Sequence, residues 1–551
     1  MAKAKYKSFM TMRKPFFSFL MLAVLMTLLS LASCSDDNNE TPKTGPDGQK
    51  LSDYTIIYYG HGGGNLDMQL LGNMMQFYFA DDESYKNVNI VAQYKFSSLE
   101  SMQDLYEEYS EMLGHYVEPG TPEYDEALKE LDIFKIYYPF AGKTARFVVD
   151  KEKAFVSGDA DEDFAEPDMS AVFGPDNADV TRPDSLTNFI NWAAQTCPAR
   201  KYILVLSDHG GGFMPNDETP VDFAAVCSRG VVYDDGHDKS HFTAKTLTQA
   251  IYQASVRPSV VYLDACLMNT AEYQFELAPL TDYLVLSTFV VPGEGGNYTE
   301  LINALSANPD NLEQALTRFT KATVDAWDET AEEKAEDSDP EPVYHDMSVY
   351  RTAEIDALGS EIKVFTDRLI AAYQNGGEDV RAKIDEVTAN AYRINESQPE
   401  YDLIDYAANL SLALPDVFGS PFDSPLGKAF DRTIVYQQSS RWLLENEHNV
   451  DLSVLLCCQG HFIIDYGILR ILFDADGQYY ILLDGKQSGE GLSWGFTLDE
   501  VYGQLRFNQI TGWSRWLKLN RQEPNSKCYT GYDPFSNITL PDDVAQVRRR
   551  K

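Results

Sequence analysis

Two segments of the chain each end an apolar run in a residue that can take part in covalent chemistry. One reads Tyr202-Ile-Leu-Val-Leu-Ser-Asp-His209-Gly-Gly-Gly212, and the other reads Val260-Val-Tyr-Leu-Asp264-Ala-Cys266-Leu-Met. Both runs predict buried strands. Because ligands bind outside the carboxyl ends of strands in open parallel sheets, we expect His209 and Cys266 to face one crevice. Their separation of 57 residues leaves room for one crossover between neighbouring strands.

A cysteine and a histidine placed in this way indicate nucleophilic catalysis. The thiolate attacks a carbonyl carbon, and the imidazole accepts the thiol proton and later passes it to the leaving amine. The glycines after His209 let the backbone approach a ligand, and a backbone N–H there could stabilise an oxyanion. Cys266 taken alone would be a buried structural thiol, but a His-Gly-Gly-Gly end on a neighbouring strand favours a nucleophile.

These residues resemble the clostripain family of cysteine peptidases. The resemblance rests on Ser-Asp-His209-Gly-Gly-Gly and Leu-Asp-Ala-Cys266-Leu-Met, with Val231-Val-Tyr-Asp-Asp235 between them. Further matching segments are Asn87–Gln93, Asn188–Trp192, Glu276–Tyr283 and, more weakly, Thr511–Ser514. The resemblance covers residues 54–305 well and the remainder loosely. The Asp-His-Gly and Asp-Ala-Cys pair is also similar to the wider caspase and gingipain group.

The resemblance implies a caspase-like α/β/α sandwich with a mostly parallel central sheet, and peptide-bond hydrolysis through a Cys–His dyad. Cys266 matches the family nucleophile and His209 the general acid/base, while the backbone amides of Gly210 and Cys266 would form the oxyanion hole. Asp264 matches the acidic residue that sets a preference for Arg or Lys before the scissile bond. A desolvated carboxylate pairs well with a guanidinium or ammonium group. The alternative for Asp264 is a strand-end residue that caps a turn or helix.

The chain departs from the family pattern after its first strand. Members usually read Asp-Asn-Asn-Leu, whereas this chain reads Gly60-His61-Gly-Gly-Gly-Asn65-Leu66. We predict that Asn65 binds substrate. For His61, an incidental residue of a glycine-rich turn is favoured over a residue at the rim of the site. If His61 lay beside Cys266, it would replace His209 as the base.

Several family members cut themselves after a basic residue in the loop beyond the catalytic histidine. Between His209 and Lys239 the only Lys or Arg is Arg229. The resemblance therefore implies a self-processing site at Arg229–Gly230.

Apolar β-branched or aromatic runs alternate with helical stretches from Tyr54 onward, which is typical of βαβ units. We expect strands at Thr55–Tyr59, Val88–Gln93, Ala145–Val149, Tyr202–Leu206, Val260–Leu263 and Tyr283–Ser287, and helices at Asp184–Thr196 and Thr246–Ala254. Residues 51–305 are predicted to form the peptidase domain and residues 306–342 a helix and an acidic linker. Residues 343–551 are predicted to form a mixed helical and β domain, with a hairpin of Ile468–Phe473 and Tyr479–Leu483.

The first 33 residues have the basic start and the short apolar run of a secretory signal peptide. The run ends Leu31-Ala32-Ser33-Cys34, which resembles a bacterial lipobox with Cys34 as the lipidated residue. Residues 34–50 would be a flexible tether. The resemblance implies an outer-membrane lipoprotein at the cell surface. Removing residues 1–33 takes away five basic residues and no acidic ones, which changes the formal charge from −40 to −45.

The charge and the motifs of the chain argue against several function classes. A strongly acidic chain repels phosphate backbones, so we expect no nucleic-acid partner. The histidines show no metal-ligand spacing, and no cofactor is predicted, with calcium left open. A lipase would need a Gly-x-Ser-x-Gly elbow, which the sequence lacks. The partners expected are protein or peptide substrates with basic residues. The alternative function is a surface glycan- or protein-binding lipoprotein without catalytic activity.

Overall fold

The computed structural model describes fourteen stretches of the 551-residue chain. These are residues 51–113, 121–124, 138–150, 172–173, 177–213, 230–237, 240–336, 344–392, 400–446, 450, 453–455, 469–473, 479–483 and 502–520. The signal peptide, Cys34 and the tether predicted at the start of the chain lie outside these residues, as does Arg229.

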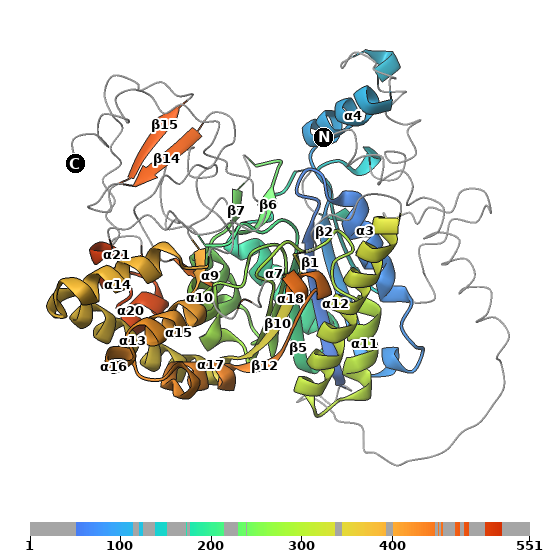
Figure 1. The fold of residues 1–551 in the computed structure, drawn as a ribbon. Helices are drawn as coiled ribbons and strands as arrows, with labels where there is room; N and C mark the ends of the chain where they lie inside the picture. Colours follow the sequence, from blue (N-terminus) through green and yellow to red (C-terminus); the bar gives the residue numbers. More distant parts are fainter. Residues whose placement is uncertain are drawn as a thin grey trace.

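A nine-stranded sheet forms the centre of the molecule (Figure 1), in the order β12-β10-β9-β8-β5-β1-β2-β3-β4. The strands from β9 to β2 are parallel, and the strands added at both edges are antiparallel. The bounds of the sheet strands are β1 Ser52–His61, β2 Val88–Lys95, β3 Thr144–Val148, β4 Val172–Phe173, β5 Ala199–Ser207, β8 Val260–Asp264, β9 Tyr283–Leu286, β10 Asp346–Arg351 and β12 Ile434–Ser439. The six strands expected from the sequence are all present.

Helices cover both faces of the sheet, because the central strands are apolar on both sides. In β1, Tyr54, Ile56 and Tyr58 pack into one core, whereas Ile57 and Tyr59 pack into the other. The first face is covered by α3 Asp67–Met75, α11 Tyr298–Ala307 and α12 Leu312–Glu336, and the second by α7 Pro183–Thr196, α9 Ala244–Gln253 and α10 Ala271–Leu277. This arrangement is the α/β/α sandwich expected from the sequence.

The two helices expected from the sequence are present as α7 and α9, within two residues of the predicted bounds. In α9, Leu247, Ala250 and Ile251 are buried along one face, and the helix begins with a capping box between Thr243 and Thr246. Helix α12 continues to Glu336, so the first part of the segment predicted as an acidic linker is helical.

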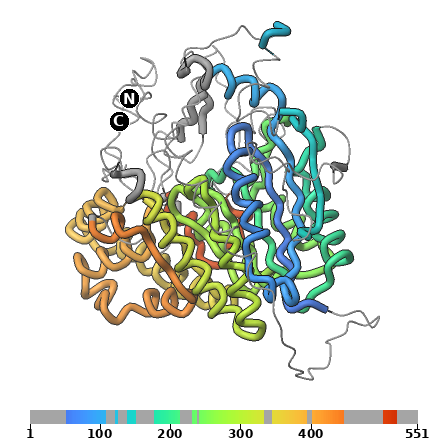
Figure 2. Tube along the Cα trace, turned by 90° about the vertical axis from the view of Figure 1, so that its right-hand side faces the viewer, coloured from blue at the N-terminus to red at the C-terminus, as the bar shows by residue number. Residues whose placement is uncertain are grey.

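The part of the chain after residue 343 extends the same sheet. Strand β10 pairs with β9, and β12 pairs with β10, so the boundary predicted at residue 343 does not coincide with an edge of the sheet. The following helices lie together on the β10 and β12 side of the molecule, away from β1 and β2 (Figures 1 and 2). They are α13 Ile355–Asn375, α14 Gly377–Ala389, α15 Leu403–Ala413, α16 Pro415–Phe418 and α17 Pro425–Thr433, with α20 Arg506–Thr511 and α21 Ser514–Leu519 beside them.

Smaller elements complete the described part. The predicted hairpin is present as β14 Leu469–Phe473 paired with β15 Tyr479–Leu483. The remaining short elements are α4 Leu99–Leu113, α18 Arg441–Asn446, β6 Val231–Asp234, β7 Ser240–Phe242, β11 Glu400–Asp402 and β13 Ser453–Leu455. Among the helices of the described ranges, none combines the length and the apolar character that crossing a bilayer demands.

Candidate active site

His209 and Cys266 follow two adjacent parallel strands at the same edge of the sheet. Strand β5 pairs directly with β8, and Ser207 lies opposite Asp264 in the register. His209 and Cys266 each come two residues later, so the two backbones leave the sheet side by side. Strand β1, which ends at His61, lies on the other side of β5 from β8. Of the two histidines, His209 is therefore the one on the strand next to Cys266.

The segment after β8 presents the Cys266 thiol at a partly exposed position. The next residue, Leu267, has a φ of 66°, a left-handed conformation that costs energy for a side chain other than glycine. Its N–H donates to the Phe289 carbonyl, which fixes this turn to the neighbouring strand end. The Val291 N–H donates to Cys266 Sγ over 3.3 Å. The segment of Phe289 and Val291 thus holds both the backbone after Cys266 and the thiol at the carboxyl edge of the sheet.

The thiol needs a base before it can attack a carbonyl carbon. Burial raises the pKa of Cys266 above its usual value, although the hydrogen bond from Val291 acts in the opposite direction. The protonated thiol therefore predominates at neutral pH, and a neutral imidazole is required to accept its proton in the attack.

The backbone at His209 is fixed by the residue before it. Asp208 is buried, and its carboxylate accepts the N–H of His209 over 2.6 Å and the N–H of Tyr233 over 2.7 Å. Burial raises the pKa of Asp208 to about 8, and the positive charge of His61 opposes this shift. Asp208 was not predicted as a site residue, although its position next to His209 in the motif was an available signal.

The first glycine after His209 allows the two reactive segments to come together. A Cβ atom on Gly210 would lie 2.2 Å from the Cys266 carbonyl oxygen and 2.9 Å from the Cys266 backbone nitrogen. Gly210 also forms an isolated antiparallel β-bridge with Val231. The hydrogen bonds of this bridge are made by the residues on either side of Gly210, since the Gly211 N–H donates to Gly230 and the His209 carbonyl accepts from Val232. Its own N–H therefore points away from Val231.

Asp264 ends β8 as a buried carboxylate with several donors around it. Its oxygens accept from the hydroxyl groups of Tyr262 over 2.7 Å and Tyr298 over 2.5 Å, and from the Gly296 N–H over 3.4 Å. Burial raises the pKa of Asp264, and these hydrogen bonds limit the shift. Among the ion pairs of the described residues, none involves Asp264. The N-cap of α11 is Asn297, but the N–H that Asp264 accepts from Gly296 belongs to the turn before that helix, so the contacts also fit the alternative of a residue that caps a turn.

The turn after β1 brings Asn65 to His209. Asn65 Oδ1 lies 2.7 Å from His209 Nε2, although the two residues are 144 positions apart. Gly63 and Gly64 have φ values of 56° and 96°, which only glycine adopts readily, and they let the turn pass close to β5. The prediction that the glycines of this segment form a turn is correct, and Asn65 in this turn contacts His209.

His61 is part of a buried group of charges, so its prediction as an incidental residue of a glycine-rich turn is wrong. We call His61, Lys95, Asp234 and Asp235 the buried ion cluster. His61 Nε2 lies 3.1 Å from Asp235 Oδ1 and 3.4 Å from Asp234 Oδ1, and Lys95 Nζ lies 2.6 Å from Asp234 Oδ1. The side chains of the cluster are at most 3% exposed, which forces the charges to pair.

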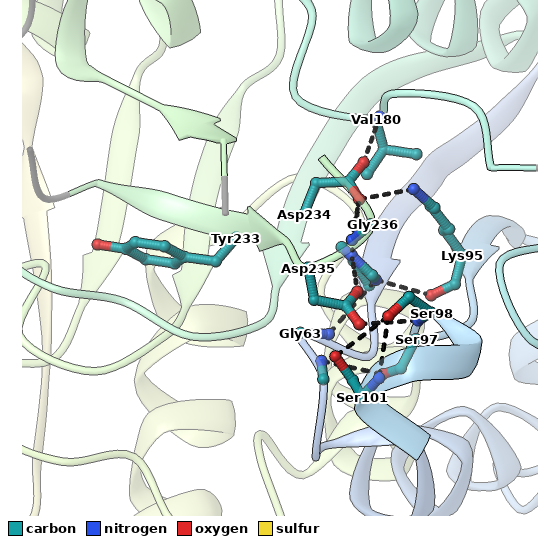
Figure 3. A network of polar contacts seen from close by, with 12 residues as sticks. Gly63, Lys95, Ser97, Ser98, Ser101, Val180, Tyr233, Asp234, Asp235 and Gly236 are labelled. Atoms are coloured by element: carbon teal, nitrogen blue, oxygen red, sulfur yellow. Dashed lines mark hydrogen bonds and ion pairs between the residues drawn. The ribbon is translucent and has the colours of Figure 1, made fainter. Parts of the chain in front are cut away.

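Backbone N–H groups complete the buried ion cluster, as Figure 3 shows. Asp234 accepts from Val180, and Asp235 accepts from Ser98 over 2.7 Å. The two carboxylates raise the pKa of His61 to about 10 against the opposing effect of burial, and they are themselves held well below their usual pKa range. Asp234 and Asp235 were not predicted to pair with His61 and Lys95, because these partners are distant in the sequence.

The buried ion cluster also contains three ligand atoms close enough to hold a metal ion. These atoms of His61, Asp234 and Asp235 all lie within 4.8 Å of one another. The positive charges of Lys95 and protonated His61 already balance the two carboxylates, however. Among the described residues, His61 Nε2 and Asp235 Oδ1 form an ion pair but no hydrogen bond, so the cluster is balanced in charge without being fully hydrogen-bonded.

Gly230, one side of the predicted self-processing bond, is the first described residue after residue 213. It is buried, and its carbonyl oxygen accepts the Gly211 N–H over 3.0 Å. Its own N–H donates to the Tyr233 hydroxyl over 2.9 Å. Gly230 itself thus lies beside Gly211, one of the glycines that follow His209.

Comparison with known proteins agrees with this arrangement. The model of the clostripain family matches residues 144–417, which include both His209 and Cys266. Clostripain of Hathewaya histolytica is 23% identical over 268 residues, which are 47% of this chain and 44% of that protein. This chain thus spans less than half the length of that relative.

Two solved structures are also similar to the chain. One is a secreted C11 cysteine protease from Bacteroides thetaiotaomicron in complex with an irreversible peptide inhibitor, with 13% identity and a TM-score of 0.46, over 84% of this chain and 100% of that chain. The other is an inactive zymogen C11 protease from Parabacteroides distasonis, with 13% identity and a TM-score of 0.46, over 84% of this chain and 98% of that chain. The match to the family model, which spans the two reactive segments, shows that the chain belongs to the clostripain family of cysteine peptidases.

Proposed function

We propose that this protein is a cysteine endopeptidase that hydrolyses peptide bonds after Arg or Lys through Cys266 and His209. The register of β5 and β8 carries the proposal, because it puts the two residues at the same level on adjacent strands. A surface-binding protein without catalytic activity would have no need of a nucleophile and a base at one strand edge.

The reaction follows from the groups present. Cys266 Sγ attacks the carbonyl carbon of the scissile bond while His209 accepts the thiol proton, and a tetrahedral oxyanion forms. The N–H groups of Gly210 and Cys266 stabilise the charge on this oxygen. His209 then gives its proton to the leaving amine, which departs as the acyl-enzyme forms. A water molecule, deprotonated by His209, hydrolyses the thioester and restores the thiol.

Asp264 would select the residue before the scissile bond. It lies two residues before the nucleophile, and the segment that donates to Cys266 through Val291 also donates to Asp264 through Gly296. A substrate guanidinium or ammonium group would supply the positive charge that the described surroundings of Asp264 lack. The high negative charge of the chain would draw basic peptides toward this site at low salt.

The decisive experiment compares wild type with Cys266→Ala and His209→Ala on fluorogenic peptides ending in Arg, Lys or a neutral residue. We expect wild type to cleave the basic peptides and both variants to lose cleavage while keeping the wild-type circular dichroism spectrum. Undiminished hydrolysis in Cys266→Ala would refute the proposed nucleophile. Activity that does not fall with rising salt would leave the acidic charge without a role in substrate attraction.

Self-processing at Arg229–Gly230 is a second part of the proposal. Gly230 pairs with Gly211, two residues after His209, which supports a scissile bond near the catalytic segment. Wild type should convert to two fragments on a denaturing gel, with the second fragment beginning at Gly230. Cys266→Ala and Arg229→Ala should remain whole. A wild-type chain that stays intact under activating conditions would contradict this step.

Anchoring through a lipid on Cys34 is the third part. The lipobox-like sequence before Cys34 supports an outer-membrane lipoprotein at the cell surface. Cells fed an alkyne-bearing fatty acid should label wild type and not Cys34→Ser. Equal labelling of the two proteins would contradict lipidation at this residue.

A further inference from the structure

The orientation of the His209 ring is set from the β1 side. A Cβ atom on Gly63 would lie 2.8 Å from His209 Cδ2, and Asn65 Oδ1 lies 2.7 Å from His209 Nε2. The Cδ2–Nε2 edge of the imidazole therefore faces the turn after β1. The opposite edge, which carries Nδ1, faces away from β1. Because β5 lies between β1 and β8, this is the direction of Cys266.

The contact with Asn65 also determines which nitrogen carries the proton. The amide oxygen of Asn65 only accepts hydrogen bonds, so a neutral His209 must keep its proton on Nε2 to make this contact. Nδ1 is then the basic nitrogen. The tautomer and the ring orientation agree, since the nitrogen that can accept the Cys266 proton is the one on the β8 side.

The turn that carries Asn65 is itself held by the core of the molecule. The Leu66 N–H and the Asn65 N–H both donate to the Gly62 carbonyl, and the Gly64 N–H donates to Ser97 Oγ over 2.9 Å. His61 anchors the start of the turn through the buried ion cluster described above. Asn65 is exposed, yet its backbone position is fixed by contacts with β2 and the segment after it.

We infer that Asn65 is a positioning residue for catalysis, whose amide oxygen holds His209 with its proton on Nε2 and its Nδ1 turned toward Cys266. This inference rests on the proposed peptidase function. It differs from a substrate-binding role for Asn65, in which the side chain would contact the peptide and not the base.

Two variants test the inference. Asn65→Leu keeps the size of the side chain and removes the acceptor, so kcat for an Arg peptide should fall by about 10- to 100-fold, as expected for a misplaced catalytic group. KM should stay within about twofold of wild type, because the substrate contacts are intact. Asn375→Leu, which replaces another exposed asparagine at the end of α13, is the matched control and should leave kcat unchanged.

Asn65→Asp keeps the acceptor and adds a negative charge beside the ring. It should retain activity, and the acidic limb of its kcat/KM profile should move up by about one pH unit, because an adjacent carboxylate favours the protonated imidazole. This readout does not depend on whether Asn65→Leu folds. A substitution that only disturbed the local structure would not move the limb in this direction.

The outcomes separate the inference from the proposed function. Loss of all activity in Cys266→Ala together with wild-type kcat in Asn65→Leu would overturn the inference alone. A raised KM with unchanged kcat in Asn65→Leu would instead assign Asn65 to substrate binding. Unchanged hydrolysis in Cys266→Ala would remove the proposed function itself.

Discussion

Replacing Gly210 by alanine tests whether the two reactive segments must touch. The new Cβ atom would lie 2.2 Å from the Cys266 carbonyl oxygen, where ordinary contacts begin at 3.4 Å. The segments would have to separate by about 1.2 Å, because both partner groups belong to the backbone. Such a displacement moves the Gly210 N–H and the Cys266 thiol relative to each other.

The expected loss follows from two independent magnitudes. Misplacing a reacting group by 1 Å costs about 10²-fold in rate, and removing one oxyanion donor costs about 10²–10³-fold in kcat. We therefore expect kcat/KM of Gly210→Ala to fall by at least about 100-fold, which corresponds to about 2.7 kcal/mol of transition-state stabilisation. The measurement is steady-state hydrolysis of an Arg fluorogenic peptide, combined with thermal unfolding of each variant.

Two control variants separate catalysis from folding. Gly72→Ala adds a methyl group to the exposed side of α3, where nothing lies within 4 Å, and should keep full activity. Gly359→Ala places a Cβ atom 2.7 Å from Phe275 in the helix packing, so it should lower the melting temperature without a 100-fold loss of kcat. A folded Gly210→Ala enzyme with kcat/KM within about threefold of wild type would refute the reasoning.

Three further predictions concern charge and protonation. Asp264→Asn should lower kcat/KM for Arg and Lys peptides by about 30-fold or more relative to neutral peptides. The substrate cation would lose its buried partner, at a cost of about 2 kcal/mol. An unchanged ratio of kcat/KM between basic and neutral peptides in a peptide-library profile would contradict this. His61→Gln should lower the melting temperature most below pH 6.5, and the difference from wild type should shrink toward pH 10. The reason is that the His61 pKa is raised to about 10, so the stabilising protonated form is lost as pH rises through that value. A difference in melting temperature that grows with pH would contradict this assignment. Alkylation of Cys266 by iodoacetamide, corrected with Cys266→Ala, should rise with pH to a midpoint above that of free cysteine measured in parallel, since burial raises the thiol pKa. A midpoint below that of free cysteine would show that the site stabilises the thiolate.

The parts of the fold that could be predicted are those with local signals. Apolar β-branched runs identified the parallel strands, and the rule that ligands bind at their carboxyl ends brought His209 and Cys266 together. Strand order was the remaining uncertainty, and the pairing of β5 with β8 resolves it. The edge strands β10 and β12 were not predicted, because their side chains alternate less clearly and their partners lie far along the chain.

The contacts that define the fine geometry of the site could not be predicted from the sequence. His61 lies 34 residues from Lys95, and farther still from Asp234 and Asp235. Whether a histidine after a strand is incidental or a charged core residue depends on carboxylates that only the folded chain brings near. The same holds for Asn65 and His209, whose contact spans 144 residues. Local patterns indicate which residues can do chemistry, and long-range packing decides how they are held.

The site uses the ends of three adjacent parallel strands, and each contributes one kind of group. In the proposed mechanism, the end of β8 supplies the nucleophile, the end of β5 supplies the base, and the end of β1 supplies the turn that orients the base. Backbones can approach at this edge only where side chains are missing, which explains why glycines occur at positions 63 and 210. The glycine-rich turn that departs from the usual family pattern is thus the element that brings Asn65 to the imidazole, and the buried ion cluster beneath it gives that turn a fixed position.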